Sequence, residues 1–204
     1  MTTEAPTPDD VLVRRALEGS EEALLELYAR YRPRLMGYVL RQTGDRALAE
    51  DVFHSTFLYF FQNLERYEPR GRLDAYLFRI ARSELADERR AARRAREGPP
   101  RPPPEAAYAP DPEMEEKVRR ALLELSPELR EVVLLRIYDG MDYAGIAEVT
   151  GVGEATARSR MRYALEALRR ALGADAPRPF SAPDDTRRSP PQPPPSPPGA
   201  RGSP

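Results

Sequence analysis

Apolar residues recur at helical spacing along most of the chain, and no long alternation of apolar and polar residues indicates a strand. Helix-starting signals divide this pattern into segments, for example Ser20 before two glutamates and Ser126 before Pro127. We therefore predict an all-α protein made of two small helical domains. A front domain spans residues 8–97 and a back domain spans residues 113–173, each with about four helices.

Proline marks the boundaries of these domains. Eighteen of the 23 prolines lie in two stretches, seven in residues 98–112 and eleven in residues 174–204. Because proline blocks helix interiors and lacks a backbone donor, neither stretch is expected to form a packed element. We interpret residues 98–112 as a semi-extended linker and residues 174–204 as a disordered tail. The alternative for the tail is a proline-rich ligand of a partner domain.

The predicted helix of residues 46–64 carries more apolar surface than one buried face requires. Its helical stripe consists of Phe53, Phe57, Phe60, Phe61 and Leu64, and the apolar residues off that stripe are Val52, Leu58 and Tyr59. A helix that is apolar almost all round must be covered on more than one side. It is either simply the central helix of a small bundle, or such a helix with a protein partner along the edge that carries Asp51 and His54.

The next predicted helix, residues 73–96, begins amphipathic and ends basic. Its buried stripe is predicted to be Leu73, Leu77, Ile80 and Ala81, and its arginines are Arg79, Arg82, Arg89, Arg90, Arg93, Arg94 and Arg96. Tyr67, Tyr76 and Phe78 lie near its start. A basic helix end is often only a solvated face, but cations beside aromatic rings are what single-stranded bases bind. The aromatic residues therefore favour a nucleic-acid surface.

Residues 142–170 show the most informative pattern of the chain. Asp142 can cap a short helix, a turn at residues 150–153 follows, and a second helix has one apolar and one polar face. The apolar face consists of Met161, Leu165, Leu168 and Leu172, and the polar face of Thr156, Arg158, Ser159, Arg160, Arg162 and Tyr163. Because such polar groups donate to phosphates and guanine edges, the pattern predicts a DNA-reading helix-turn-helix rather than a bundle with a solvated basic face.

The elements before this second helix are expected to support it from the inside. Residues 126–139 are predicted to form one amphipathic helix whose apolar positions are Leu129, Val132, Val133, Leu135 and Ile137. The short helix after Asp142 is expected to turn Tyr143, Ile146, Ala147 and Val149 inward. Gly153 stands at the cap of the second helix, where a serine would bind the helix start more firmly.

Charge is distributed unevenly along the chain. The formal net charge is −1, but residues 31–97 carry +4 and residues 152–173 carry +3, against −4 for residues 113–151. Exposed charges more than about 10 Å apart are largely screened at physiological salt, so local patches rather than the total decide binding to DNA. The overall charge is therefore compatible with two separate nucleic-acid surfaces.

Several classes of protein are excluded by what the sequence lacks. It has no cysteine and one histidine, and it shows no carboxylate cluster with metal spacing and no nucleophile–base pair. We therefore expect no metal site, no cofactor and no catalytic activity. No stretch approaches the roughly 20 apolar residues of a membrane span, and the N-terminal residues are acidic, unlike a secretion signal. A cytoplasmic location is expected.

The motifs AEDVFHSTFLYFF and LDAYLFRIARSELADERRAARR resemble region 2 of bacterial sigma factors, and more narrowly the two-domain extracytoplasmic-function group. The resemblance implies that the first motif, with Asp51 and His54, contacts the clamp helices of RNA polymerase. It implies that the second motif recognises and opens the promoter −10 element, with a flipped base captured at the loop of residues 66–72. The residues implied at the −10 element are Tyr67, Arg70, Arg82, Ser83, Arg89, Arg90 and Arg93.

Four positions depart from the pattern of that family. His54 stands where glutamine is usual, Phe61 and Tyr76 stand where tryptophan is usual, and Ser83 replaces a common asparagine. The two aromatic replacements keep a flat ring on which a base can stack. Ser83 lacks the asparagine amide, so base recognition at this position departs from the family pattern.

The segment LSPELREVVLLRIYDGMDYAGIAEVTGVGEATARSRMRYALEALRR resembles region 4 of sigma factors, including the T-x-x-S-R run at Thr156, Ser159 and Arg160. In that family region 4 reads the −35 element and touches the polymerase flap tip. The two resemblances cover about residues 10–97 and 113–172. They imply a promoter-specificity subunit whose partners are core RNA polymerase and promoter DNA, with an anti-sigma factor left open.

Two other functions compete with this one. The first is a helix-turn-helix transcription regulator that binds duplex DNA without engaging core polymerase, which leaves the surplus apolar surface of helix 46–64 unexplained. The second is an enzyme acting on nucleic acid, for which the sequence offers no catalytic group. Absence of polymerase binding would favour the first, and a nuclease assay tests the second.

Overall fold

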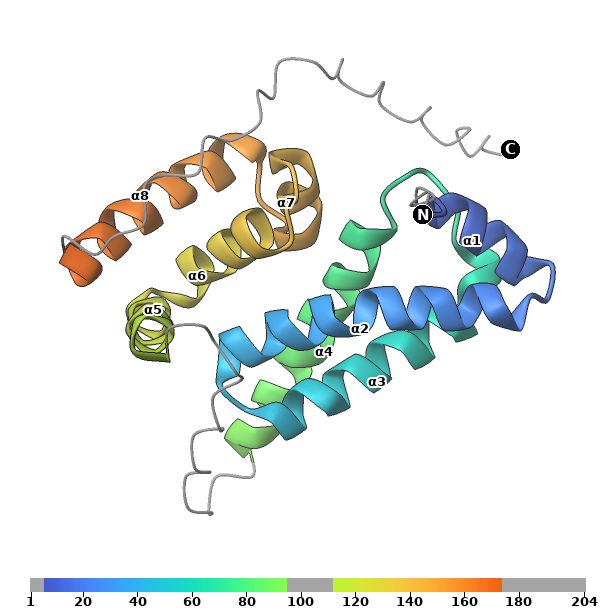
Figure 1. Cartoon of the computed structure of the whole chain (residues 1–204), viewed down its shortest axis with the longest axis horizontal. Coiled ribbons are helices and arrows are strands. Elements are labelled where there is room, and N and C mark those ends of the chain that lie inside the picture. The colour runs from blue at the N-terminus through green and yellow to red at the C-terminus, as the bar shows by residue number, and fades with distance from the viewer. Residues whose placement is uncertain (1–5, 95–111, 174–204) are drawn as a thin grey trace, which may run out of the picture.

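The structure of this chain, a computed structural model, describes residues 6–94 and 112–173. The elements in these ranges are all helices, so the predicted all-α fold is confirmed (Figure 1). The predicted linker at 98–112, apart from its last residue, and the predicted tail at 174–204 lie outside the described residues. None of the described helices has the length and apolar content that crossing a membrane requires.

The helices form two units. The front unit contains α1 (Asp9–Leu17), α2 (Glu21–Thr43), α3 (Arg46–Gln62), the 3₁₀ turn η1 (Leu64–Arg66) and α4 (Leu73–Arg94). The back unit contains α5 (Pro112–Glu124), α6 (Pro127–Val133), the π-helical turn η2 (Leu134–Tyr138), α7 (Tyr143–Thr150) and α8 (Glu154–Leu172).

Local sequence explains where the front helices begin and end. The hydroxyl of Ser20 accepts from the start of α2, and Asp45 caps α3 in the same way. Gly44, between them, has a φ of 72° and ends α2 in the left-handed region that glycine adopts without strain. The helix predicted over residues 46–64 ends earlier, at Gln62, and continues as η1.

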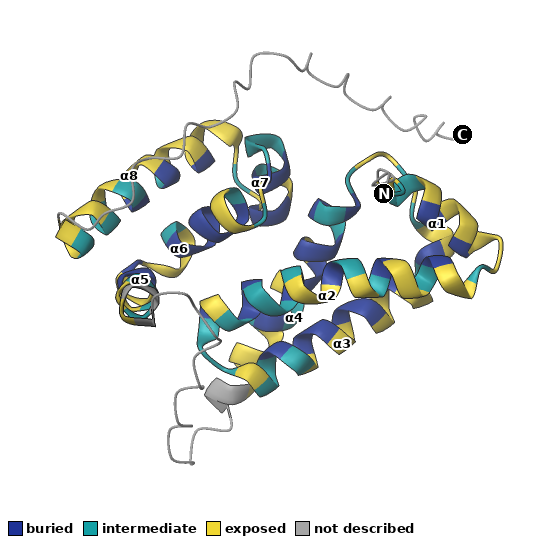
Figure 2. Ribbon diagram, viewed as in Figure 1, coloured by how far each residue is buried: buried dark blue, intermediate teal, exposed yellow. Residues whose placement is uncertain are grey.

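The core of the front unit lies where α2, α3 and α4 meet, and Figure 2 shows buried residues on their facing sides. The predicted stripe of α4 is buried as expected. In α3, Phe53, Phe57 and Phe60 are buried, but Phe61 is 37% exposed. Leu58 and Tyr59 are 59% and 47% exposed, so part of the surplus apolar surface of α3 faces away from the described chain.

The back unit departs from the sequence expectation at one element. The single helix predicted over residues 126–139 is capped by Ser126 but becomes the π-helical turn η2 after Val133. A π turn contains an extra residue, which rotates the following side chains relative to α-helical register. Val132, Val133 and Leu135 are buried, whereas Ile137, predicted to lie inside, is 48% exposed.

The two units pack against each other. Helix α4 contacts α7, and α2 contacts α5, α6 and η2 (Figure 1). Two charged residues of α6 are buried at this junction, Arg130 and Glu131. The guanidinium of Arg130 donates to the carbonyls of Leu122, Leu123 and Leu125 at the end of α5, and across the junction to the carbonyl of Gln42 at 2.8 Å.

Candidate nucleic-acid interface

The second helix of the predicted helix-turn-helix is α8, and it presents two distinct faces. Ala157, Met161 and Ala164 are buried against the rest of the back unit, while Leu165, Leu168 and Leu172 are half-buried. The predicted DNA-facing residues of α8 are exposed, with Arg160 half-buried at the edge: Thr156, Arg158, Ser159, Arg160, Arg162 and Tyr163. The structure therefore places six predicted residues along one polar face of one helix.

The turn before α8 has the geometry of a helix-turn-helix. Gly151 has a φ of 73° and ends α7, and Gly153 precedes α8 without a side-chain cap, as the sequence indicates. Asp142 caps α7 through the backbone N–H of Gly145 at 2.7 Å. Asp142 thus fixes the start of α7 and Gly151 its end, and α8 follows from Glu154.

Tyr143 and Arg136 lie beside this face, and the sequence did not indicate that they contact each other. Tyr143, predicted to point inward, is half-buried, and two guanidiniums lie close to its ring. Arg158 is 4.5 Å and Arg136 is 5.0 Å from the ring centroid. Arg158 also pairs with Glu154 at 3.1 Å. The i, i+4 spacing of Glu154 and Arg158 was visible in the sequence, whereas the contact with Tyr143 depends on how α7 crosses α8.

Three rings form an aromatic cluster beside the loop of residues 66–72. The centroids of Tyr67 and Tyr76 are 4.8 Å apart, and Phe60 lies about 6 Å from both. Burial raises the pKa of the Tyr67 hydroxyl, as it does that of Tyr76, so both stay neutral at physiological pH. Phe78 was also predicted to serve this surface, but it is buried and packs on Tyr38, so that prediction was wrong.

The basic residues predicted for the −10 element are spread along α4 and the loop before it. Ser83, Arg89 and Arg90 are exposed on α4, and Arg70 is exposed in the loop, paired with Glu68. Arg90 pairs with Asp87 on its own helix, while Arg89 reaches the carbonyl of Gln42 at 3.4 Å. The side chain of Arg93 is outside the described part of the structure, as is the whole of Arg96.

One predicted −10 residue is engaged by the other unit. The Nε of Arg82 donates to Glu131 of α6 at 2.8 Å, and the Glu131 side chain is 8% exposed. The same carboxylate oxygen accepts from the hydroxyl of Tyr38 at 2.8 Å. Burial, with the Glu131 charge next in size, raises the pKa of Tyr38 well above its ordinary value, so this hydroxyl remains a donor.

The residues predicted to face the polymerase lie on α3. Asp51 and His54 are both exposed and less than one helical turn apart. Leu58 follows His54 one turn along the same helix and is exposed as well. This edge thus combines polar groups with an uncovered apolar side chain.

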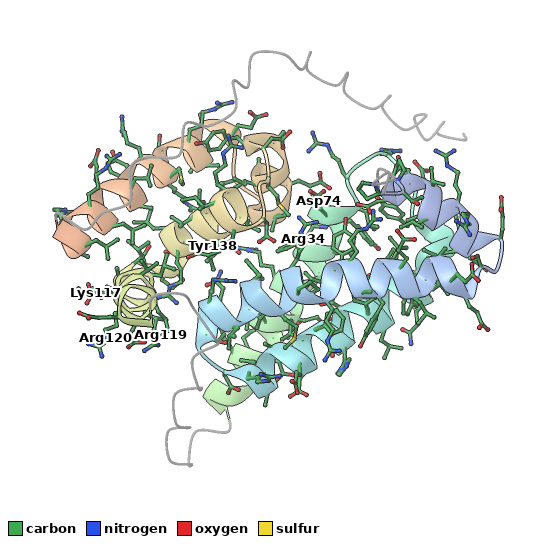
Figure 3. The ribbon with its side chains drawn as sticks, viewed as in Figure 1. Arg34, Asp74, Lys117, Arg119, Arg120 and Tyr138 are labelled. Carbon is green, nitrogen blue, oxygen red and sulfur yellow. The ribbon has the colours of Figure 1, made fainter. Side chains whose placement is uncertain are left out.

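Sequence reasoning also missed the charged residues between the units. Arg34 of α2 lies 3.5 Å from the carboxylate of Asp139, and Arg41 stacks on the Tyr138 ring at 4.2 Å. Figure 3 shows Arg34 of the front unit and Tyr138 of the back unit where the two units face each other. Burial raises the pKa of Asp139 to about 6, although Arg34 acts in the opposite direction. Within residues 6–94 and 112–173, no group of three or more metal-ligating side chains comes together.

Family models match both units. Residues 27–95 match the model described as Sigma-70 region 2, and residues 115–168 match the model described as Sigma-70, region 4. The first match covers α3 and α4 with most of α2, and the second covers the helix-turn-helix. The chain is therefore similar to this family over both of the units that pack in the structure.

Relatives and solved structures agree with these matches. RNA polymerase sigma factor CarQ of Myxococcus xanthus is 32% identical over 166 residues, covering 79% of this chain and 95% of the relative. ECF RNA polymerase sigma factor SigL of Mycobacterium tuberculosis is 38% identical over 164 residues, covering 75% and 91%. The structure of CnrH in complex with the cytosolic domain of CnrY is 25% identical with a TM-score of 0.65, covering 83% of this chain and 99% of that one. The sigma factor RpoE with the anti-sigma factor NepR, from Bartonella quintana, shares the fold at 23% identity and a TM-score of 0.63, covering 74% and 96%.

Proposed function

This chain belongs to the sigma-70 family of RNA polymerase sigma factors, in its extracytoplasmic-function group, and we propose from this premise how its two units divide promoter recognition. As a sigma factor it directs core RNA polymerase to specific promoters and initiates transcription there. The observation that carries this function is the order of the two matches in one chain, region 2 followed by region 4. A helix-turn-helix regulator that does not engage polymerase would not require the first match.

The back unit, residues 113–173, reads the −35 element in this proposal. The support is the single exposed face of α8, where hydroxyl and guanidinium donors lie on one side of a helix narrow enough for the major groove. Arg158, Arg162 and Tyr163 contact base edges and phosphates, and Thr156, Ser159 and Arg160 add donors to the same strand. The back unit also touches the polymerase flap tip.

The front unit, residues 8–97, opens and holds the −10 element. Tyr67 and Tyr76, half-buried beside the buried Phe60, supply flat surfaces on which an unpaired base stacks. The cations of α4 and its preceding loop neutralise the phosphates of the same strand. Those residues are Arg70, Arg82, Ser83, Arg89, Arg90 and Arg93, with Ser83 donating through its hydroxyl.

The edge of α3 that carries Asp51 and His54 binds the clamp helices of core polymerase. The support is the exposed apolar surface beside these residues, at Leu58, Tyr59 and Phe61, which the described chain leaves uncovered. An anti-sigma factor is a further partner, because RpoE is bound by NepR in the structure that shares this fold. The protein works in the cytoplasm with its polymerase and has no catalytic activity of its own.

Transcription from a genomic fragment library tests this proposal. Core polymerase and this protein are incubated with the fragments, and the 5′ ends of the transcripts are sequenced. We expect new start sites that share a −35 and a −10 box and that disappear when either the core enzyme or the protein is omitted. Binding to duplex DNA without any core-dependent start would contradict a sigma factor and indicate the simple regulator.

A further inference from the structure

The loop of residues 66–72, which carries Tyr67 and Arg70, is held on one side by helix α1. The backbone N–H of Gly71 donates to the carboxylate of Asp10 at 3.1 Å, across 61 residues of sequence. Helix α1 also contacts η1, the turn that leads into the loop. Figure 1 shows the loop passing beside the first turn of α1. A distant segment of the chain thus restrains the loop that we propose to capture a −10 base.

Gly71 is the residue at which this loop turns. Its φ is 68°, in the left-handed region that glycine adopts without strain. The backbone N–H of Tyr67 ties one end of the loop to η1, and the carbonyl of Arg72 ties the other end to the start of α4. Gly71 lies between these two bonds and directly follows Arg70. The bond to Asp10 therefore restrains the loop at the side of an arginine proposed to bind the −10 strand.

Helix α1 is itself tied to α2 through the neighbouring residue, Asp9. One carboxylate oxygen of Asp9 accepts from Arg30 at 2.6 Å, and the other accepts from the hydroxyl of Tyr31 at 2.5 Å. Arg30 also donates to the carbonyl of Thr7 at 2.7 Å. Burial, with the hydrogen bond to Asp9 next in size, raises the pKa of Tyr31, so its hydroxyl remains a donor. The first turn of α1 is therefore anchored where Asp10 reaches the loop.

Acidic residues in the first turn of a helix often serve only to stabilise its N-terminus. Here both carboxylates bond to other elements, Asp9 to α2 and Asp10 to the loop. Burial is the first cause of the raised pKa of Tyr67 and the charge of Asp10 the second, so Asp10 also lies near this ring. A negative charge beside a DNA-binding loop repels phosphates, so any gain from Asp10 has to come from its hydrogen bond. Both acids precede residue 27, where the region 2 match begins.

We propose that Asp10 is a positioning residue of the −10 site: by holding Gly71 it keeps the loop of residues 66–72 in the shape that captures the unpaired base. The loop is then ordered before the strand arrives, so binding does not lose the entropy of ordering it. Asp10 acts through the loop and through Tyr67 and Arg70, which contact the strand, and it does not contact the DNA itself. This inference rests on the −10 role proposed for the loop.

Two DNA probes separate this role from general damage to the protein. The first is a fork, base-paired at the −35 element and single-stranded along the non-template −10 strand, and the second is the −35 duplex alone. Both come from a promoter identified by the transcription experiment above. Fluorescence anisotropy measures their binding to the complex of the full chain with core polymerase. The ratio of the two affinities isolates capture of the −10 strand, whereas a loss of folding or of core binding lowers both.

The substitutions at Asp10 separate its hydrogen bond from its charge. Asp10→Ala removes the acceptor and should lower the affinity for the fork about fivefold, with the −35 duplex unchanged. If Asp10 were only a surface charge, the same variant would bind the fork more tightly, because it removes repulsion from the phosphates. Asp10→Asn keeps an oxygen acceptor without the charge and should stay within about twofold of the unmodified chain. Glu18→Ala, exposed directly after the other end of α1, is the matched control and should change neither affinity.

Asp9→Ala tests whether α1 carries the restraint. It removes the bonds to Arg30 and Tyr31, so it should lower the melting temperature and weaken binding of the fork as Asp10→Ala does. A lower melting temperature with normal affinity for the fork would show that the loop does not depend on the anchoring of α1.

The outcomes distinguish this inference from the proposed function. Affinity for the fork that is unchanged or higher in a folded Asp10→Ala chain, or an Asp10→Asn chain as weak as Asp10→Ala, would overturn the role of Asp10. Failure of the proposed −10 site has a different signature, because Tyr67→Ala would then bind the fork like the unmodified chain.

Discussion

The two candidate DNA surfaces of this protein differ in how exposed they are in the free chain. The polar face of α8 is exposed, is carried by one helix and uses contacts within its own unit, such as that of Arg158 with Tyr143. The −10 surface is spread over α4 and the loop before it, and at Arg82 it is engaged by the other unit. A rigid, preformed helix suits the −35 DNA, which is bound as a base-paired duplex. The −10 strand, in contrast, must be captured while the duplex opens. The chain therefore has one DNA surface, on α8, that is exposed and one, on α4, that the other unit partly covers.

The largest effect on this comparison is expected from Arg130, which joins the two units from inside. Arg130→Met keeps the length of the side chain but leaves four backbone carbonyls without this donor. We expect a loss of about 3 kcal/mol in the free energy of unfolding, because buried groups deprived of a charged partner are costly. Thermal unfolding followed by circular dichroism measures it, and Arg120→Met, an exposed arginine of α5, is the control. A melting curve identical to that of the control would show that the junction does not depend on Arg130.

The next prediction contrasts one arginine from each surface. Arg162→Gln should weaken binding to duplex −35 DNA about tenfold, equally in the free chain and in the polymerase complex, because α8 is exposed in either case. Arg82→Gln should weaken binding of the −10 strand strongly only in the polymerase complex. In the free chain the Nε of Arg82 is bonded to Glu131, so the loss there should be smaller. Fluorescence anisotropy in both states measures these effects, and equal losses for Arg82→Gln in the two states would contradict the difference between the surfaces.

A smaller, pH-dependent effect is expected at Asp139. Its pKa is raised to about 6 in the packed state, where Arg34, Arg41 and Asp74 are the charged groups around it, against 3.8 for an ordinary aspartate. The packed state thus binds more protons between about pH 4 and pH 6 than the separated state. Acidification therefore favours packing, and this gain is lost as the pH rises through 6.

Asp139→Asn tests this dependence because asparagine imitates the protonated carboxyl. We expect the unmodified chain to shift towards the packed state by about tenfold between pH 7 and pH 5, and the variant to shift by much less. Because the chain contains no cysteine, energy transfer between fluorescent labels on Ser55→Cys and Glu166→Cys provides the measurement. A variant that follows the same pH curve as the unmodified chain would remove Asp139 as the cause.

The smallest effect concerns the start of helix α8, which carries the exposed DNA surface. Gly153 has an extended backbone at the cap of α8, and a Cβ at this position meets no atom within 4 Å. Gly153→Ser should therefore fit without strain and stabilise α8 by a few tenths of a kcal/mol, roughly 1 °C in melting temperature. Gly151→Ser is the opposite control: it lies at a φ of 73° and should destabilise the turn. A loss of stability at both positions would mean that the turn is more constrained than its geometry indicates.

The sequence predicted the parts of this fold that depend on neighbouring residues. Ser20, Ser126 and Asp142 cap the helices that they were expected to cap, and the stripes of α3 and α4 are largely buried. Such signals are local, because a cap or a helical face is decided within a few residues. The chain order of the two motifs was enough to identify the family.

The junction between the units could not be predicted in this way. Glu131 meets Tyr38 across 93 residues and Arg130 meets Gln42 across 88, so no local pattern marks either contact. Charged residues are rarely buried unless paired, and the sequence does not show which pairs form at a distance. The exposure of Ile137 escaped prediction for a related reason, because η2 changes the helical register after Val133.

The contact between Arg82 and Glu131 has a consequence for gene dosage. Both partners belong to one polypeptide, so every molecule carries this contact in a fixed ratio of one to one. A separate inhibitor protein is titrated when the cell makes more of its target. A contact within one chain keeps the same stoichiometry at any level of expression. A sharp threshold in the response to rising expression would therefore have to come from another molecule.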